Sequence, residues 1–148
     1  MIKKILLLFL FLVLSCPCFA NNSQQKEDED FIRTIINSPS ARLSKHQLSL
    51  KQDYELSKNG NKQTLYSQIE ALELKYKNAD DKISKINYKY VEELKNLYLF
   101  VIETPYTNSF SVDFYNNFEK RKLIIPDKDY EKLEESLKEI IPLVNVYY

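Results

Sequence analysis

Residues 62–103 read KQTLYSQIEALELKYKNADDKISKINYKYVEELKNLYLFVIE, and this stretch decides the fold. Its apolar residues recur at alternating steps of four and three, which is the spacing of a heptad repeat. Neither Gly nor Pro interrupts the repeat before the stop signal Thr104-Pro105. The repeat consists of Leu65, Ile69, Leu72, Tyr76, Ala79, Ile83, Ile86 and Tyr90. The pattern therefore predicts one long, coiled-coil-like helix over about 62–103.

The alternative is a break in the middle of this helix. Helix propensity dips at residues 78–81, which read NADD, and an uninterrupted helix would be longer than a compact domain. We expect the continuous form. A shorter neighbouring helix can cover only part of it, so some apolar positions are expected to meet a partner chain. These positions, called the heptad seam below, are Leu65, Ile69, Leu72, Tyr76, Ile83, Ile86 and Tyr90.

Outward from the long helix, the sequence predicts further helices on both sides. On the N-terminal side, Ser38-Pro39 is typical of a helix start, and Asn59-Gly60-Asn61 contains the only Gly of the chain, so a helix is expected between them. On the C-terminal side, Phe110, Phe114 and Phe118 predict a helix over about 109–121, and Asp127 is expected to cap a last helix. Both helices are expected to cover the core. The apolar end, residues 142–148, is expected either to dock in extended form or to serve as a recognition tail.

Composition favours helices throughout. The chain is 44% hydrophobic and 13% aromatic, which suits a globular core, yet it contains one Gly and five Pro. Sheet proteins need many tight turns and draw on both residues for them. Because residues 97–102 are apolar on every side of a helix, the core is expected to centre there. The predicted fold is all-α, a small helical bundle built around the long helix.

The first 20 residues predict a signal peptide. Lys3 and Lys4 supply the charged start, residues 5–14 are apolar, and Cys18-Phe19-Ala20 places small residues at the two positions that signal peptidase reads. The apolar run is only about 15 Å long as a helix, half of a bilayer core. We expect cleavage after Ala20 and export of the chain to the periplasm, the cell surface or the medium. The leader resembles bacterial export signals in general.

A second cleavage site competes with the first. Residues 13–16 read VLSC and resemble the lipobox of bacterial lipoproteins, in which Cys16 would become the lipidated first residue. Pro17 directly after the cysteine fits that pattern poorly and suits ordinary cleavage better. Contact with a membrane is expected only if Cys16 is lipidated. No disulfide can form in the exported domain, because Cys16 and Cys18 are the only cysteines.

Between the leader and the domain, residues 21–30 are polar and end in the charged run KEDED. This composition predicts a flexible polar and acidic linker. The acids stand consecutively, without the alternating, Gly-centred spacing of a calcium loop. A short helix is expected over about 28–37, and the helical domain is expected over 31–148.

The sequence offers no recognisable catalytic chemistry. A lone Gly60 excludes Gly-rich phosphate loops and dinucleotide fingerprints, and a lone His46 has no Cys or His partners for zinc. Glu92 and Glu93 are adjacent on a helix and point about 100° apart, so they cannot face one substrate together. The chain balances 21 basic against 21 acidic residues and lacks the basic field that nucleic acids require. No enzyme activity, cofactor, metal or nucleic-acid partner is expected.

The sequence thus leaves two classes of function. The first hypothesis is an exported helical binding or structural protein, which contacts a protein partner or a second copy of itself through the heptad seam or the tyrosines beside it. The alternative is a periplasmic chaperone or envelope-assembly factor whose helical arms hold unfolded clients. No residue motif identifies either.

Overall fold

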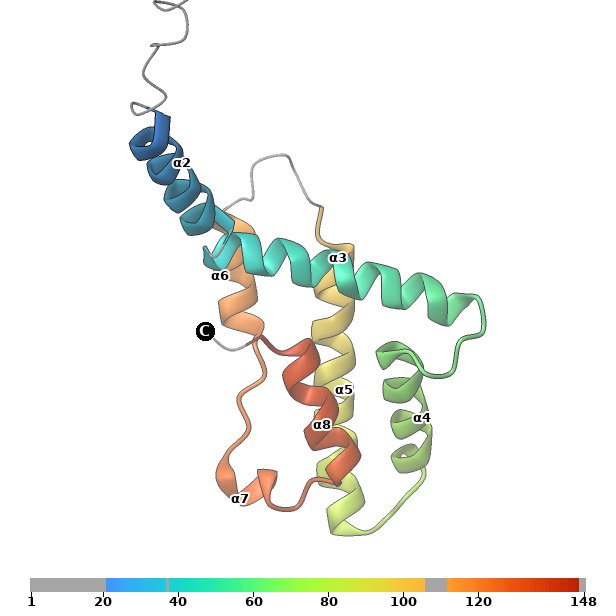
Figure 1. Ribbon diagram of the computed structural model, residues 1–148. Helices are drawn as coiled ribbons and strands as arrows, with labels where there is room; N and C mark the ends of the chain where they lie inside the picture. The colour runs from blue at the N-terminus through green and yellow to red at the C-terminus, as the bar shows by residue number, and fades with distance from the viewer. Residues whose placement is uncertain (1–20, 37, 106–111, 147–148) are drawn as a thin grey trace, which may run out of the picture. The chain divides into compact units, whose positions relative to one another are not determined.

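The computed structural model describes residues 21–36, 38–105 and 112–146, which form seven helices and no strands. The predicted signal peptide, its cleavage after Ala20 and the lipidation of Cys16 lie outside the described residues, as does Phe110. No helix in the described part is long and apolar enough to cross a membrane. The helices are α2 (Asn21–Ile36), α3 (Pro39–Lys58), α4 (Leu65–Lys77), α5 (Lys82–Glu103), α6 (Val112–Arg121), α7 (Asp127–Tyr130) and α8 (Glu135–Val144) (Figure 1).

The chain divides into two compact units at Ser38. The described part of the first unit is essentially α2, which begins at Asn21, so residues 21–30 are helical where a flexible linker was expected. This polar stretch contains several good helix formers, and its side chains bond at helical spacing. Gln25 Nε2 lies 3.3 Å from Glu29 Oε1, and the Thr34 hydroxyl donates to the Asp30 carbonyl over 2.8 Å. The second unit, Pro39–Tyr148, contains the other helices.

The prediction of one continuous helix over 62–103 was wrong. The chain turns back at residues 78–81, and α4 and α5 pack side by side as a hairpin (Figure 1). The backbone N–H of Asn78 donates to Tyr76 as α4 ends, and the Asp81 carboxylate accepts from the N–H of Ser84, 2.9 Å away, as α5 begins. Asn and Asp favour helix ends over helix interiors. The helix therefore breaks at residues 78–81, where the dip in helix propensity had offered that alternative.

The predicted helix from Pro39 to about Lys58 is confirmed as α3. It ends where Gly60 adopts a positive φ of 88°, the left-handed conformation that favours Gly. One face of α3 buries Leu43 and Leu50. From the same face, Gln47 donates hydrogen bonds to the carbonyls of Val101 and Thr104 at the end of α5, so α3 is fixed across that end.

The core of the second unit centres on α5, as predicted. Its buried side chains are Tyr90, Val91, Leu94, Leu97, Tyr98 and Val101, with Asn87 nearer the start. The helices α3, α4 and α8 pack against α5. Phe114 and Phe118 of α6 are buried in the same core, which confirms that α6 forms part of its cover.

The last helix does not run from Asp127, so that prediction was also wrong. A single turn, α7, is followed by a separate helix, α8, and the residue that precedes α7 is Pro126, with no capping side chain. Asn87 of α5 explains the interruption. Its amide donates to the Lys132 carbonyl over 3.2 Å and accepts from the Glu134 N–H over 2.8 Å. Asn87 thereby holds the backbone between α7 and α8 in a non-helical form.

A polar network around Asp53 joins α3, α4 and α5. The two carboxylate oxygens of Asp53 accept from the backbone N–H groups of Leu65 and Tyr66, at 2.9 and 3.0 Å. The buried Tyr98 hydroxyl lies 2.8 Å from Asp53 Oδ2 and from the Leu50 carbonyl. Burial, followed by the hydrogen bond to Asp53, raises the pKa of Tyr98. The network thus satisfies orphan donors at the start of α4 with a side chain from α3.

His46 connects α3 to the end of α8. Its Nε2 atom lies 2.8 Å from the Val144 carbonyl, and burial is the main reason that its pKa is lowered from 6.5. The folded state therefore holds a proton on His46 less readily than the unfolded state does.

We expect the free energy of unfolding to decrease as the pH falls through this histidine's titration. The loss begins near pH 6.5, where the unfolded histidine takes up its proton, and is complete below the lowered pKa of the folded protein. Denaturant unfolding from pH 8 to pH 5 measures the dependence. His46→Gln keeps a donor for the Val144 carbonyl but cannot titrate. If the two proteins show the same pH dependence over this range, His46 is not responsible.

A candidate ligand pocket between α5 and residues 121–124

The heptad seam lies mostly inside the second unit. Of the residues predicted to contact a partner, Ile69, Leu72, Tyr76 and Tyr90 are buried, and Leu65 and Ile86 pack partly buried against the core. Ile83 alone of the seven is exposed, at 57%. The turn at residues 78–81 therefore folds the apolar positions of α4 and α5 into one common core. Most of the apolar positions that were expected to need a partner chain are covered within this chain instead.

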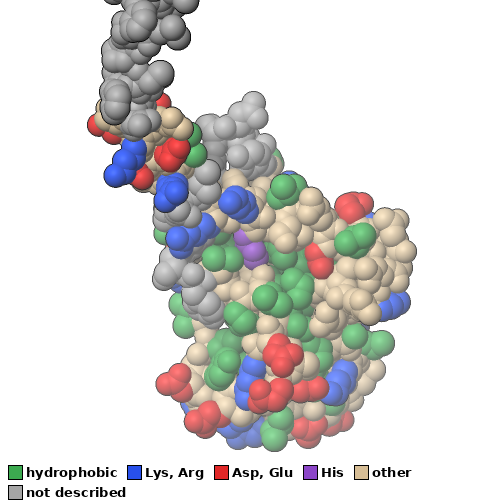
Figure 2. Space-filling view, in the orientation of Figure 1, with side chains coloured by type: hydrophobic (Ala, Val, Ile, Leu, Met, Phe, Trp, Pro, Cys, Tyr) green, Lys and Arg blue, Asp and Glu red, His purple; other side chains and the backbone are tan. Residues whose placement is uncertain are grey.

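The surface of the second unit carries other features. Figure 2 shows apolar side chains near the middle of one face and acidic side chains at the end where α7 and the start of α8 lie. Leu48 and Leu56 are exposed on the face of α3 turned away from its buried stripe. Each leucine lines a shallow hollow along α3, of about 270 Å³ at Leu48 and about 450 Å³ at Leu56, and all the lining residues lie between Ser44 and Asn59.

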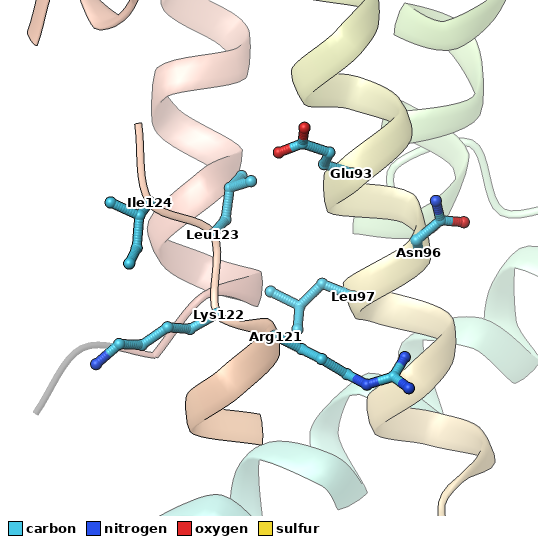
Figure 3. A pocket seen from close by; sticks show the side chains of 7 residues that line it. All are labelled: Glu93, Asn96, Leu97, Arg121, Lys122, Leu123 and Ile124. Carbon is cyan, nitrogen blue, oxygen red and sulfur yellow. The ribbon is translucent and has the colours of Figure 1, made fainter. Parts of the chain in front are cut away.

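One of several hollows on the described surface lies between α5 and the chain that leaves α6, and both polar and apolar residues line it. Its volume is about 280 Å³. Figure 3 shows α5 on one side and the extended chain after α6 on the other, with Leu97 and Leu123 between them. The lining residues are Glu93, Asn96, Leu97, Arg121, Lys122, Leu123 and Ile124.

The wall opposite α5 is held in place by Asn145, just after α8. The N–H of Leu123 donates to Asn145 Oδ1 over 2.9 Å, and Asn145 Nδ2 donates to the Leu123 carbonyl over 2.8 Å. Asn145 is fully buried, and Leu123 is only 4% exposed. Leu123 is thus anchored through both of its backbone polar groups, while the neighbouring Ile124 is 75% exposed.

The two walls bring opposite charges to the pocket. Glu93 lies on α5, with Lys89 Nζ 3.9 Å from its carboxylate. Arg121, at the end of α6, places its guanidinium carbon 4.5 Å from the centre of the Phe100 ring. Asn96 adds an amide to the α5 wall. A ligand in this pocket would meet an apolar floor with an acid and a guanidinium beside it.

The acids and the histidine that were considered and rejected as catalytic residues in the sequence are not brought together here. Glu93 lines the pocket, whereas its neighbour Glu92 is absent from the lining, as their 100° separation on a helix requires. His46 lies at the contact between α3 and α8 instead. Among the lining residues that the structure describes, there is no Cys, Ser, Thr or His. No cluster of metal-binding side chains occurs in the described ranges.

Sequence reasoning missed the pocket. The short apolar run Leu123-Ile124-Ile125, between the basic pair Arg121-Lys122 and Pro126, was the available signal, but it was too short to assign. Comparison of the chain with known protein families, curated proteins and solved structures finds no match.

Proposed function

We propose that the chain is an exported, non-catalytic helical binding protein that holds a segment of a partner protein in the pocket between α5 and residues 121–124. The observation that supports the proposal most is that the lining combines an acid, Glu93, and a guanidinium, Arg121, from opposite walls with the apolar side chains of Leu97 and Leu123. Apolar pockets with a few placed polar groups are typical of ligand sites. The described lining residues offer carboxylate, guanidinium, ammonium and amide groups but no hydroxyl, thiol or imidazole, which favours binding over covalent catalysis by Ser, Thr, Cys or His.

The pocket is a better candidate than the heptad seam because five of its seven lining residues, all except Leu97 and Leu123, are exposed or partly exposed in the folded chain. Self-association through the seam would require α4 and α5 to separate, since each buries its seam positions in the shared core. No observation on the described residues favours the chaperone alternative, because α4 and α5 pack against α3 and α8 rather than projecting as arms. Export and the choice between Ala20 and Cys16 stay predictions from the leader sequence.

The proposal predicts peptide binding that depends on Arg121. A phage-displayed library of random peptides would be selected on the purified protein, and the enriched peptides would be measured by fluorescence polarisation. We expect dissociation constants in the micromolar range, about −8 kcal/mol in free energy. Arg121→Glu should weaken these peptides at least about tenfold, because it places a second acid opposite Glu93.

Arg42→Glu is the matched control, since Arg42 is exposed on α3 and does not line the pocket. Its binding should stay within about twofold of the wild type, as expected for a charge outside the contact. Peptides that bind wild type and Arg121→Glu equally well would place their site elsewhere. Failure of the library to enrich any peptide would also count against the proposal.

A further inference from the structure

We infer that the partner segment binds in extended form and pairs with the backbone of Ile124 as an added β-strand. The inference rests on the proposed binding function and specifies its ligand class, a short extended peptide. Four properties of residues 121–126 support it: side-chain alternation, the pairing of Leu123, the open backbone of Ile124 and the pocket beside it.

The side chains after α6 alternate as they do in a strand. Leu123 is buried, Ile124 is exposed, and Ile125 is partly buried against the core. The chain is drawn out rather than coiled at this point (Figure 3). Alternation with a period of two is the property of extended backbone. These residues are therefore shaped like an edge strand although no strand lies beside them in the described chain.

Asn145 already occupies one side of this extended chain. Its amide accepts from the Leu123 N–H and donates to the Leu123 carbonyl. Two antiparallel strands exchange the same pair of bonds at a hydrogen-bonded position. A side chain thus takes the place of one neighbouring strand and fixes the direction in which the polar groups of Leu123 point.

The next residue has its polar groups on the other side. In extended backbone, the N–H and C=O of successive residues point in opposite directions, so those of Ile124 point away from Asn145. Within the described ranges, neither group of Ile124 has a hydrogen-bond partner. Among the residues described in the second unit, Ile124 is also the most exposed large apolar one. An open backbone edge of this kind accepts an added strand.

The pocket gives this short edge its specificity. Strand addition uses main-chain bonds for affinity and pockets for alternate side chains to select the sequence. Pro126 has no N–H and ends the edge on one side, and α6 ends it on the other at Arg121. The ligand is therefore a few residues long, with an apolar side chain over Leu97 and Leu123 and polar groups toward Glu93 and Arg121.

Two measurements on a peptide from the selection test the strand pairing. In the complex, amide exchange at Ile124 should slow at least about tenfold, because its N–H becomes hydrogen-bonded, whereas exchange at Leu123 should change little. Single N-methylation along the peptide should abolish binding at one position and leave it nearly unchanged at the neighbouring one, since alternate N–H groups face the protein.

Variants of Ile124 provide an independent check. Ile124→Pro removes the N–H and should lose peptide binding at least about tenfold, while Ile124→Ala keeps the backbone and removes only the side chain that lines the pocket, so it should weaken binding less than Ile124→Pro does. Thermal unfolding shows whether the proline variant folds, and the methylated peptides leave the protein untouched.

Arg121-dependent binding that tolerates every N-methyl group, with unchanged exchange at Ile124, would overturn strand pairing and leave the proposed function intact. Absence of Arg121-dependent binding would overturn the proposed function itself.

Discussion

Replacing Asn145 with alanine is expected to lower the free energy of unfolding by about 3 kcal/mol, because it removes two buried hydrogen bonds to the backbone of Leu123. The N–H and C=O of Leu123 each lose a bond to the Asn145 amide, and the site is fully buried. Denaturant unfolding, followed by circular dichroism, measures the loss. Asn116→Ala, on the exposed side of α6, is the control and should leave the midpoint unchanged.

The same substitution should also weaken peptide binding under conditions where the variant is still folded. Leu123 forms part of the pocket wall, and without Asn145 nothing among the described side chains fixes both of its polar groups. A loss of stability below about 1 kcal/mol would show that Leu123 is satisfied in another way. In that case Asn145 does not hold the wall.

Replacing Asp53 with alanine is expected to cost a similar amount, about 3 kcal/mol, because it removes a helix cap and a partly buried acceptor together. The N–H groups of Leu65 and Tyr66 lose their acceptor at the start of α4, and the Tyr98 hydroxyl loses its charged partner. Denaturant unfolding again measures the change. Asp80→Ala, at an exposed position in the turn, should leave the midpoint unchanged.

Tyr98→Phe separates the two contributions of Asp53. It keeps the ring in the core and removes only the hydroxyl, so we expect a smaller cost of about 1–2 kcal/mol. The double variant should then lose less than the sum of the single losses, since both substitutions break the same bond. Additive losses would mean that the two side chains act independently, which contradicts the network.

Much of the fold could be predicted from local sequence. The start of α3 at Pro39, its end near Gly60 and the position of the core around α5 all follow from residue preferences that act within a few positions. Phe114 and Phe118 were likewise assigned to the cover of the core from their spacing alone. In each case the local preference and the final packing agree.

The errors arose where capping and tertiary contacts decide the outcome. A heptad pattern identifies an apolar face, but it does not say whether a second chain or the other half of the same pattern meets that face. Asp81 caps the start of α5, so the helix breaks before it. The seam residues of α4 and α5 then pack into one core within the same chain. Asn87 similarly interrupts the last predicted helix from a position 47 residues away.

The pocket could not be predicted, because its wall depends on a contact between distant residues. Leu123 looks like an ordinary apolar residue in a short run, and Asn145 looks like a polar residue near the chain end. Only the folded chain brings the amide of Asn145 to both polar groups of Leu123, 22 positions away. The charges at the pocket come from separate helices for the same reason.

The hairpin of α4 and α5 has a consequence for the order in which the chain assembles. Its halves are close in sequence, as in the ion pair between Lys95 and Glu73, so closing it costs little loop entropy. The contact between His46 and Val144 spans 98 positions and requires the remaining helices to be in place. Asn145 adjoins that contact, so we expect the candidate pocket to be complete only once α8 has docked.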